Sequence, residues 1–290
     1  MDQDRTTVPR RQLGRYLRRL RDEGGMTIRT AGEAIECSTV KIWRIESGLQ
    51  QVRTPDVQAL CDVYQAPPEV TETLVKLARQ TADGWWQAYG DAVPDWFELY
   101  VSMEEATDRI RHYNGELVPG LLQTRRYMEE MMRIGRPDWT DDDRERRVEL
   151  RLKRQRLLGR KRPAAPQLDV VLSEAVLRRP LADHAAMVEQ LRHLTTLNER
   201  ANVRIRILPL AVGPHRASIG GAFTLLTFPQ PKRDRGDPPM IYQEGPTGAL
   251  YLDRPEDIGV YDAIWRDLAR LALSEAESID VIDSFAGERR

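Results

Sequence analysis

The side chains best suited to recognising another molecule lie in the stretch 38–46, which reads STVKIWRIE. Thr39 can form a hydrogen bond with a base or a phosphate, and Val40 can contact the methyl group of thymine. Lys41 is a compact positive charge that suits a phosphate, whereas Arg44 can bind guanine through two hydrogen bonds or clamp a phosphate. When these residue types lie on the first turns of a helix, they can contact base edges in duplex DNA.

A short helix has to present these side chains. Ser38 is of the type that caps the start of a helix, and Gly48 is placed to end it. Ile42 and Ile45 are three residues apart and are expected to face inward. Trp43 could pack on the next helix or contact DNA, and we favour packing because large aromatic residues tend to be buried. The prediction is therefore a helix whose outer face carries the polar and charged residues.

Four more helices are expected in the first 83 residues. Thr27 is a suitable cap for the second helix, and a tight turn at Glu36 and Cys37 joins it to the helix that follows Ser38. Two neighbouring helices joined in this way form a helix-turn-helix. Apolar residues at helical spacing predict the other helices over 10–23, 55–64 and from 67 to about 83.

Charge is distributed unevenly along the chain. The net charge is −1, yet residues 10–53 contain ten Arg or Lys against five acids, a local charge of +5. Arg53 is the last member of this basic set and, like Ser38, is expected to contact DNA. A basic module on an otherwise acidic chain is typical of a tethered DNA-binding domain, and its partner would be double-stranded DNA.

The region after residue 83 has a different composition. Aromatic residues gather around Trp85 and Trp96, where an inter-domain core is favoured over stacking of single-stranded bases because no basic residue is interleaved. A helix is expected over 102–113, and a turn at Pro119 leads into another helix. The charged helix over 141–162 could be a second nucleic-acid surface, but long charged helices are usually solvated, so we favour a solvated face.

Strand patterns begin at residue 167. Residues 168–172 are apolar, and residues 203–207 alternate with a period of two. The fold class is therefore α+β and multidomain. An all-α, phage-repressor-like helix-turn-helix domain of five helices spans 1–83, a helical connection spans 84–166, and an α/β sheet domain spans 167–290. The remaining strands are expected at 222–228, 240–243 and 249–252, with helices around Leu191 and over 260–271.

Catalysis is weakly indicated. His215 could act with carboxylates such as Glu174, Glu244 and Asp253, and the glycines at 220–221 could admit a phosphate. However, the chain has no nucleophile elbow, P-loop, dinucleotide fingerprint or metal-ligand spacing, so we expect neither an enzyme nor a cofactor.

Cellular location follows from what the sequence lacks. Cys37 and Cys61 are expected to be free, buried thiols of a reducing compartment. The absence of a signal peptide or an apolar run of membrane length predicts a cytoplasmic, nucleoid-associated protein without a membrane partner.

Residues 10–66 resemble a known family. The segments 20–23, 25–27 and 42–48 (LRDE, GMT and IWRIESG) are similar in wording and spacing to the phage-repressor-like (Cro/C1, or Xre) helix-turn-helix family. The resemblance implies that Glu46 forms a structural ion pair with Arg21. Many relatives hold a phosphate with a glutamine at the position of Ile28, so the resemblance makes Arg29 the substitute contact here.

Nearly all of residues 84–285 resemble a second family. The resemblance is to actinobacterial regulators that carry a DUF5753 domain, also described as Scr1-type antitoxin-like transcriptional regulators. It implies gene regulation and a possible small partner of the DUF397 type. A homodimer is expected because two-fold pairing lets two helices bind a palindromic operator. The alternative is an antitoxin-like protein that mainly sequesters that partner, with DNA binding being autoregulatory. The segments that carry the resemblance are WW, EEA, VPGLLQT, RLKRQ, SEAVLR, QL, ILP, GAFT and YQE, in that order, between 85 and 244.

Overall fold

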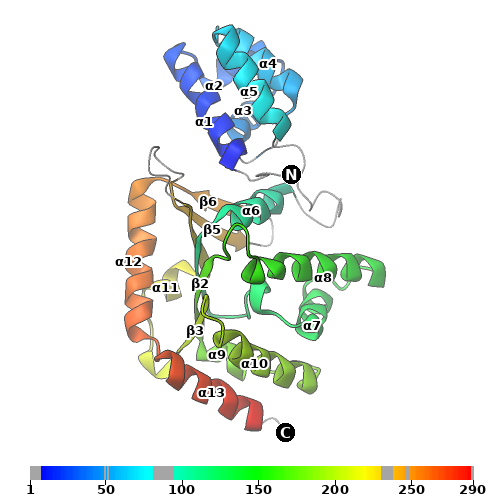
Figure 1. Cartoon of the computed structure of the whole chain (residues 1–290), viewed down its shortest axis with the longest axis vertical. Coiled ribbons are helices and arrows are strands. Elements are labelled where there is room, and N and C mark those ends of the chain that lie inside the picture. Colours follow the sequence, from blue (N-terminus) through cyan, green and yellow to red (C-terminus); the bar gives the residue numbers. More distant parts are fainter. Residues whose placement is uncertain are drawn as a thin grey trace. The chain divides into compact units, whose positions relative to one another are not determined.

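The computed structural model describes residues 8–48, 50, 52–80, 95–229, 238–245 and 248–288. The chain forms two compact units, residues 1–106 and 107–290, which are described in turn (Figure 1). In the described part, no helix is long and apolar enough to cross a membrane. The predicted fold class, a five-helix helix-turn-helix region followed by a sheet domain with helices, is confirmed.

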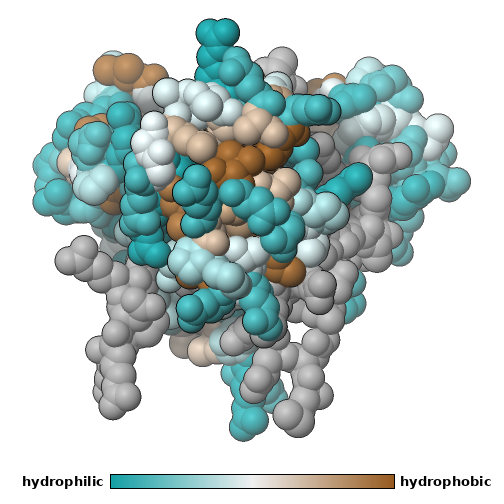
Figure 2. Space-filling model, turned by 90° about the horizontal axis from the view of Figure 1, so that it is seen from above, coloured by the Kyte–Doolittle hydropathy of each residue, from teal (hydrophilic) through white to brown (hydrophobic). Residues whose placement is uncertain are grey.

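The N-terminal unit is built from short helices around one apolar core. On the face that Figure 2 shows, hydrophobic side chains gather near the centre and hydrophilic ones border them. Leu17, Ile42 and Leu60 are completely buried in the core. Such a core is the main source of stability because helices of this length are marginal by themselves. The helices around this core are α1 (Val8–Glu23), α2 (Ile28–Ala34), α3 (Thr39–Glu46), α4 (Thr54–Val63) and α5 (Pro68–Gln80), and the unit also includes α6 (Asp95–Ala106), which contributes none of its described residues to the core.

Local chemistry sets where these helices begin and end. The Thr27 hydroxyl accepts a hydrogen bond from the backbone N–H of Thr30 at 3.1 Å and caps α2. After α1, Gly25 adopts a φ of +64°, which turns the chain out of the helix. Glu36 has a φ of 53° in the turn between α2 and α3. The turn is therefore tight enough to hold the two helices as a pair.

Gly14 allows α1 to lie directly against the end of α3. A Cβ atom at this position would lie 2.6 Å from the carbonyl oxygens of both Ile45 and Glu46. Those oxygens belong to backbone, which cannot rotate away as a flexible side chain would. The close contact between the two helices therefore depends on glycine.

The C-terminal unit contains a mixed six-stranded sheet in the order β3-β2-β1-β4-β5-β6. Strand β1 pairs in parallel with β2, and β2 pairs in parallel with β3. Strand β4 is antiparallel to β1, and β5 and β6 continue the antiparallel half. The sheet therefore changes from parallel to antiparallel pairing at β1. The strands are β1 (Arg109–Asn114), β2 (Gln167–Ser173), β3 (Val203–Leu208), β4 (Phe223–Thr227), β5 (Met240–Gly245) and β6 (Gly248–Leu252).

Helices cover both faces of this sheet (Figure 1). On one face, Ile264, Trp265 and Leu268 of α12 (Pro255–Leu271) pack with Phe223 and Ile241 of the strands. The opposite face carries α7 (Arg125–Gly135), α8 (Asp141–Gln155) and α10 (His184–Asn198). The remaining elements are the short helices η2 (Gly120–Leu122), η3 (Arg156–Gly159), α9 (Glu174–Arg178), η4 (Leu210–Val212) and α11 (Arg216–Gly220), and the C-terminal α13 (Glu275–Glu288).

Strand β3 lies at one edge of the sheet, and outward backbone groups of Ile205 and Ile207 are hydrogen-bonded. The N–H of Ile205 donates to Oδ1 of Asn198 at 2.7 Å, and the N–H of Ile207 donates to Oγ of Ser278 at 2.9 Å. The N–H of Leu273 donates to the carbonyl oxygen of Ile207, also at 2.9 Å. Side chains of α10 and α13 therefore take the place of a further strand.

Two expectations for the middle of the chain need comment. The predicted helix over 102–113 is wrong in its second half, where residues 109–114 form β1. Pairing with β2 and β4 on both sides stabilises this segment as a strand, and local helical spacing does not report such long-range pairing. The predicted aromatic core around Trp85 lies outside the described residues.

Candidate nucleic-acid interface

Helix α3 presents its first turn to the surroundings. The Ser38 hydroxyl accepts a hydrogen bond from the backbone N–H of Lys41 at 3.1 Å and caps the helix. Thr39, Val40 and Arg44 are exposed, and the exposed fraction of Val40 is 54%. The side chains that sequence analysis selected for contact with bases are therefore accessible on one short helix.

Trp43 differs from expectation. The sequence favoured packing against α4, but half of this side chain (50%) is exposed. Ile42 and Ile45 already provide the contact of α3 with the core, so the helix does not need to bury the indole as well. Trp43 consequently adds an apolar, aromatic surface beside Arg44.

A buried ion pair holds α3 against α1. Nε of Arg21 donates to Oε1 of Glu46 at 2.7 Å, and its Nη2 donates to Oε2 at 2.9 Å. Arg21 also donates to the carbonyl oxygen of Met26 at 2.7 Å, and the hydroxyl of Tyr64 donates to Glu46 at 3.4 Å. The hydrogen bond to Glu46 raises the pKa of Arg21, and burial raises the pKa of Tyr64. Glu46 is thus a buried structural residue, and its negative charge does not lie on the outer face of α3.

The cations on α3 and the neighbouring helix α2 are not equivalent. Nζ of Lys41 forms an ion pair with Asp56 of α4 at 3.1 Å, and Nε of Arg29 forms one with Glu33 at 3.0 Å. Sequence analysis missed the partner Asp56, although an acid in the first turn of α4 was a visible signal. Among the described contacts, Arg44 has no ion pair, so its guanidinium is available to an outside partner.

Arg53 is separated from α3 in the sequence but also lies at a helix start. It occupies the N-cap position of α4, is exposed, and has no ion pair among the described contacts. The partial positive charge at a helix N-terminus adds to that of its side chain. The local charge therefore favours an anion such as a phosphate.

Comparisons with known families agree with this geometry. Residues 12–74 match a model described as a helix-turn-helix domain, and residues 97–284 match the model of DUF5753, a domain of unknown function. The chain belongs to the DUF5753 family. No match is found among curated proteins or among solved structures. The N-terminal unit of this DUF5753 protein thus carries a helix-turn-helix, which makes DNA its expected partner.

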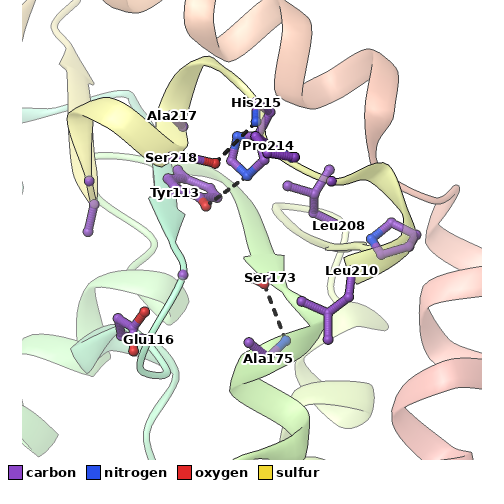
Figure 3. A pocket seen from close by; sticks show the side chains of 15 residues that line it. Tyr113, Glu116, Ser173, Ala175, Leu208, Leu210, Pro214, His215, Ala217 and Ser218 are labelled. Carbon is purple, nitrogen blue, oxygen red and sulfur yellow. Dashed lines mark hydrogen bonds between the residues drawn. The ribbon is translucent and has the colours of Figure 1, made fainter.

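The DUF5753 region has a cavity of about 460 Å³ at one end of the sheet (Figure 3). His215 lies on its wall, with Nε2 3.3 Å from the hydroxyl of Tyr113 and the two rings edge to face. Glu174, Glu244 and Asp253 are not among the residues that line it. The suggested cluster of these carboxylates with His215 is therefore not assembled in this cavity.

The described ranges show no group suited to metal binding or to nucleophilic thiol chemistry. These ranges contain no cluster of three or more His, Cys, Asp or Glu side chains that could hold a metal ion. Cys37 and Cys61 are free, and burial raises the pKa of both thiols. Cys61 is buried as expected, whereas Cys37 is only partly buried. Neither thiol is activated as a nucleophile, because a raised pKa favours the protonated form.

Proposed function

We propose that this DUF5753 protein is a sequence-specific, DNA-binding transcriptional regulator that inserts α3 into the major groove of an operator. The observation that carries the proposal is the outward face of α3 in a helix-turn-helix domain, where Thr39, Val40 and Arg44 are exposed together. This face offers a hydroxyl, an apolar contact and a guanidinium, which are three of the groups that distinguish bases in the major groove.

The cations are proposed to divide the work. Arg44 contacts a base or the adjoining phosphate, while Lys41, Arg29 and Arg53 contact phosphates that set the position of the helix. Lys41 has to exchange Asp56 for a phosphate, and Arg29 has to exchange Glu33. These exchanges reduce the net gain from both residues, so Arg44 is expected to contribute most.

The protein is further proposed to act as a homodimer, with two copies of α3 on the half-sites of a palindrome. The DUF5753 region would then provide dimerisation, partner binding or effector sensing. A small DUF397-type partner, with an antitoxin-like role for this chain, stays a prediction from the resemblance. Co-expression followed by gel filtration tests for a stable complex.

Genomic mapping of binding sites with the tagged protein identifies the operator, and fluorescence anisotropy then measures binding. Arg44→Ala is expected to weaken specific binding by about 1–3 kcal/mol. The matched control is Arg19→Ala, which removes an exposed arginine that pairs with Glu23 on α1. The control should bind within about twofold of the wild type. Wild-type affinity of Arg44→Ala over a range of salt concentrations would refute the assignment of this contact.

A further inference from the structure

The cavity of the C-terminal unit lies where the strand ends converge. Its walls come from the residues that follow the carboxyl ends of β1, β2 and β3 and from those that precede β4. Because β4 is antiparallel to β1, its start lies at the same end of the sheet as the end of β1. The cavity therefore lies at the point where the sheet changes from parallel to antiparallel pairing.

Cavities in this position of an open α/β sheet commonly bind ligands. Where neighbouring connections leave a sheet in different directions, a crevice opens beyond the carboxyl ends of the strands, and ligands of open α/β sheets bind there. Here the connection after β2 enters α9, whereas the connection after β3 runs through η4 and α11 before it reaches β4. The volume of about 460 Å³ is within the range of small-molecule sites.

The charge of the wall restricts the ligand. Among the described residues that line the cavity there is no lysine or arginine, and the one carboxylate among them, Glu116, forms an ion pair with Arg179. Burial lowers the pKa of His215, so its ring is uncharged near neutral pH. An anion would find no cation in the wall, and a cation would have to compete with Arg179 for Glu116.

Apolar side chains and hydroxyl groups share the wall. Leu208, Leu210 and Pro214 offer an apolar surface on one side (Figure 3). The hydroxyl oxygen of Ser173 accepts from the N–H of Ala175 at 3.2 Å, and that of Ser218 accepts from the N–H of His215, also at 3.2 Å. Each hydroxyl still has its own proton to donate. The two serines can therefore donate to oxygen atoms of a bound molecule.

We propose that this cavity binds an uncharged small molecule that has an apolar ring or chain and at least one hydroxyl or carbonyl oxygen. The apolar part lies against Leu208, Leu210 and Pro214, and the oxygen accepts a hydrogen bond from Ser173 or Ser218. This site is confined to the C-terminal unit, so it does not depend on whether α3 binds DNA.

Three aromatic probes of similar size test the proposal on the full-length protein. Benzyl alcohol has the required oxygen, toluene lacks it, and benzoate is an anion. The readout is a ¹H–¹³C spectrum of the protein labelled in its four histidines, with His184 as an internal reference because it lies on α10 and not on the cavity wall. His215→Asn assigns the signal of His215.

Benzyl alcohol is expected to shift the His215 signal with a Kd of about 1 mM and to leave that of His184 in place. Toluene should bind about threefold to tenfold more weakly, because it forms no hydrogen bond. Benzoate should give no saturable shift. Binding of benzoate as tight as that of benzyl alcohol would refute the ligand class, and no saturable His215 shift with any probe would refute the site.

Variants separate the cavity from its surroundings. Leu210→Trp fills the cavity from a side chain that is half exposed and should abolish the shift, whereas Ile134→Trp, on the exposed side of α7, should retain it. Ala222→Phe is a second filling variant, and the unshifted signals of His184 and His193 verify that each variant is folded. One of the two variants Ser173→Ala and Ser218→Ala should weaken benzyl alcohol about threefold to tenfold and leave toluene unchanged. Wild-type binding by both filling variants would overturn the proposal.

Discussion

The two units use buried polar groups in opposite ways. In the N-terminal unit, Arg21 and Glu46 satisfy each other in the interior, and the side chains available to a partner lie outside on α3. In the C-terminal unit, Tyr113 and His215 line a cavity between elements of the sheet. The first arrangement makes an outward surface that suits a large partner, and the second makes a concave surface that suits a small one.

The largest expected effect concerns the ion pair. Glu46→Ala removes the buried carboxylate that pairs with Arg21 and leaves the guanidinium only the exposed Asp22 as an acidic partner, which should lower the free energy of unfolding by about 3 kcal/mol. The control Glu33→Ala removes an exposed pair with Arg29 and should cost at most about 1 kcal/mol. Urea unfolding followed by circular dichroism measures both. Equal losses in the two variants would show that the buried pair is no more important than the surface pair.

The stability of the two units should respond differently to acid, because all four histidines lie after residue 107. Burial and the nearby guanidinium of Arg154 lower the pKa of His112 from 6.5 to about 4. The unfolded chain then binds protons more readily than the folded one. Stability from this group is complete above pH 6.5 and is lost as the pH falls toward 4, by about 3 kcal/mol in total.

Denaturation of the full chain at a series of pH values measures this loss, and His112→Gln should flatten the profile. His193 and His215 also have lowered pKa values and add to the same trend. An unchanged profile in His112→Gln would show that another group dominates the acid sensitivity.

The smallest expected changes in the free energy of unfolding come from replacing two glycines by alanine. Gly14→Ala places a methyl group against the backbone of α3 and should lower the free energy of unfolding by about 1–3 kcal/mol. Gly259 lies inside α12 with no atom within 4 Å of an added Cβ, so Gly259→Ala should raise that energy by about 0.5–1 kcal/mol. Opposite shifts of the melting temperature are the expected result. A lower free energy of unfolding for Gly259→Ala would mean that the space around residue 259 does not admit a methyl group.

The helical unit could be predicted from sequence because its signals are local. Thr27 and Ser38 lie next to the helices that they cap, and Ile42 and Ile45 show their inward direction by spacing alone. Strand β1 could not be predicted in the same way. Its stability comes from β2 and β4, whose paired residues are about 60 and 115 positions away in the sequence.

The candidate interface was only partly predictable for the same reason. Exposure of Thr39 and Arg44 follows from the helical period, once Ile42 and Ile45 face inward. The pairing of Lys41 with Asp56 depends on how α3 and α4 meet, and the half exposure of Trp43 depends on what the core leaves uncovered. Both are properties of tertiary packing, which residue spacing along one helix does not contain.

The outer border of β3 has a consequence for behaviour at high concentration. An edge strand with unpaired backbone N–H and C=O groups can pair with a strand of a neighbouring molecule. Such pairing is a common route to aggregation. Asn198, Ser278 and Leu273 occupy the hydrogen-bonding positions that an incoming strand would need. Ser278 of the C-terminal helix occupies the N–H of Ile207, so a chain truncated before α13 would leave this position of the edge open to a strand of another copy.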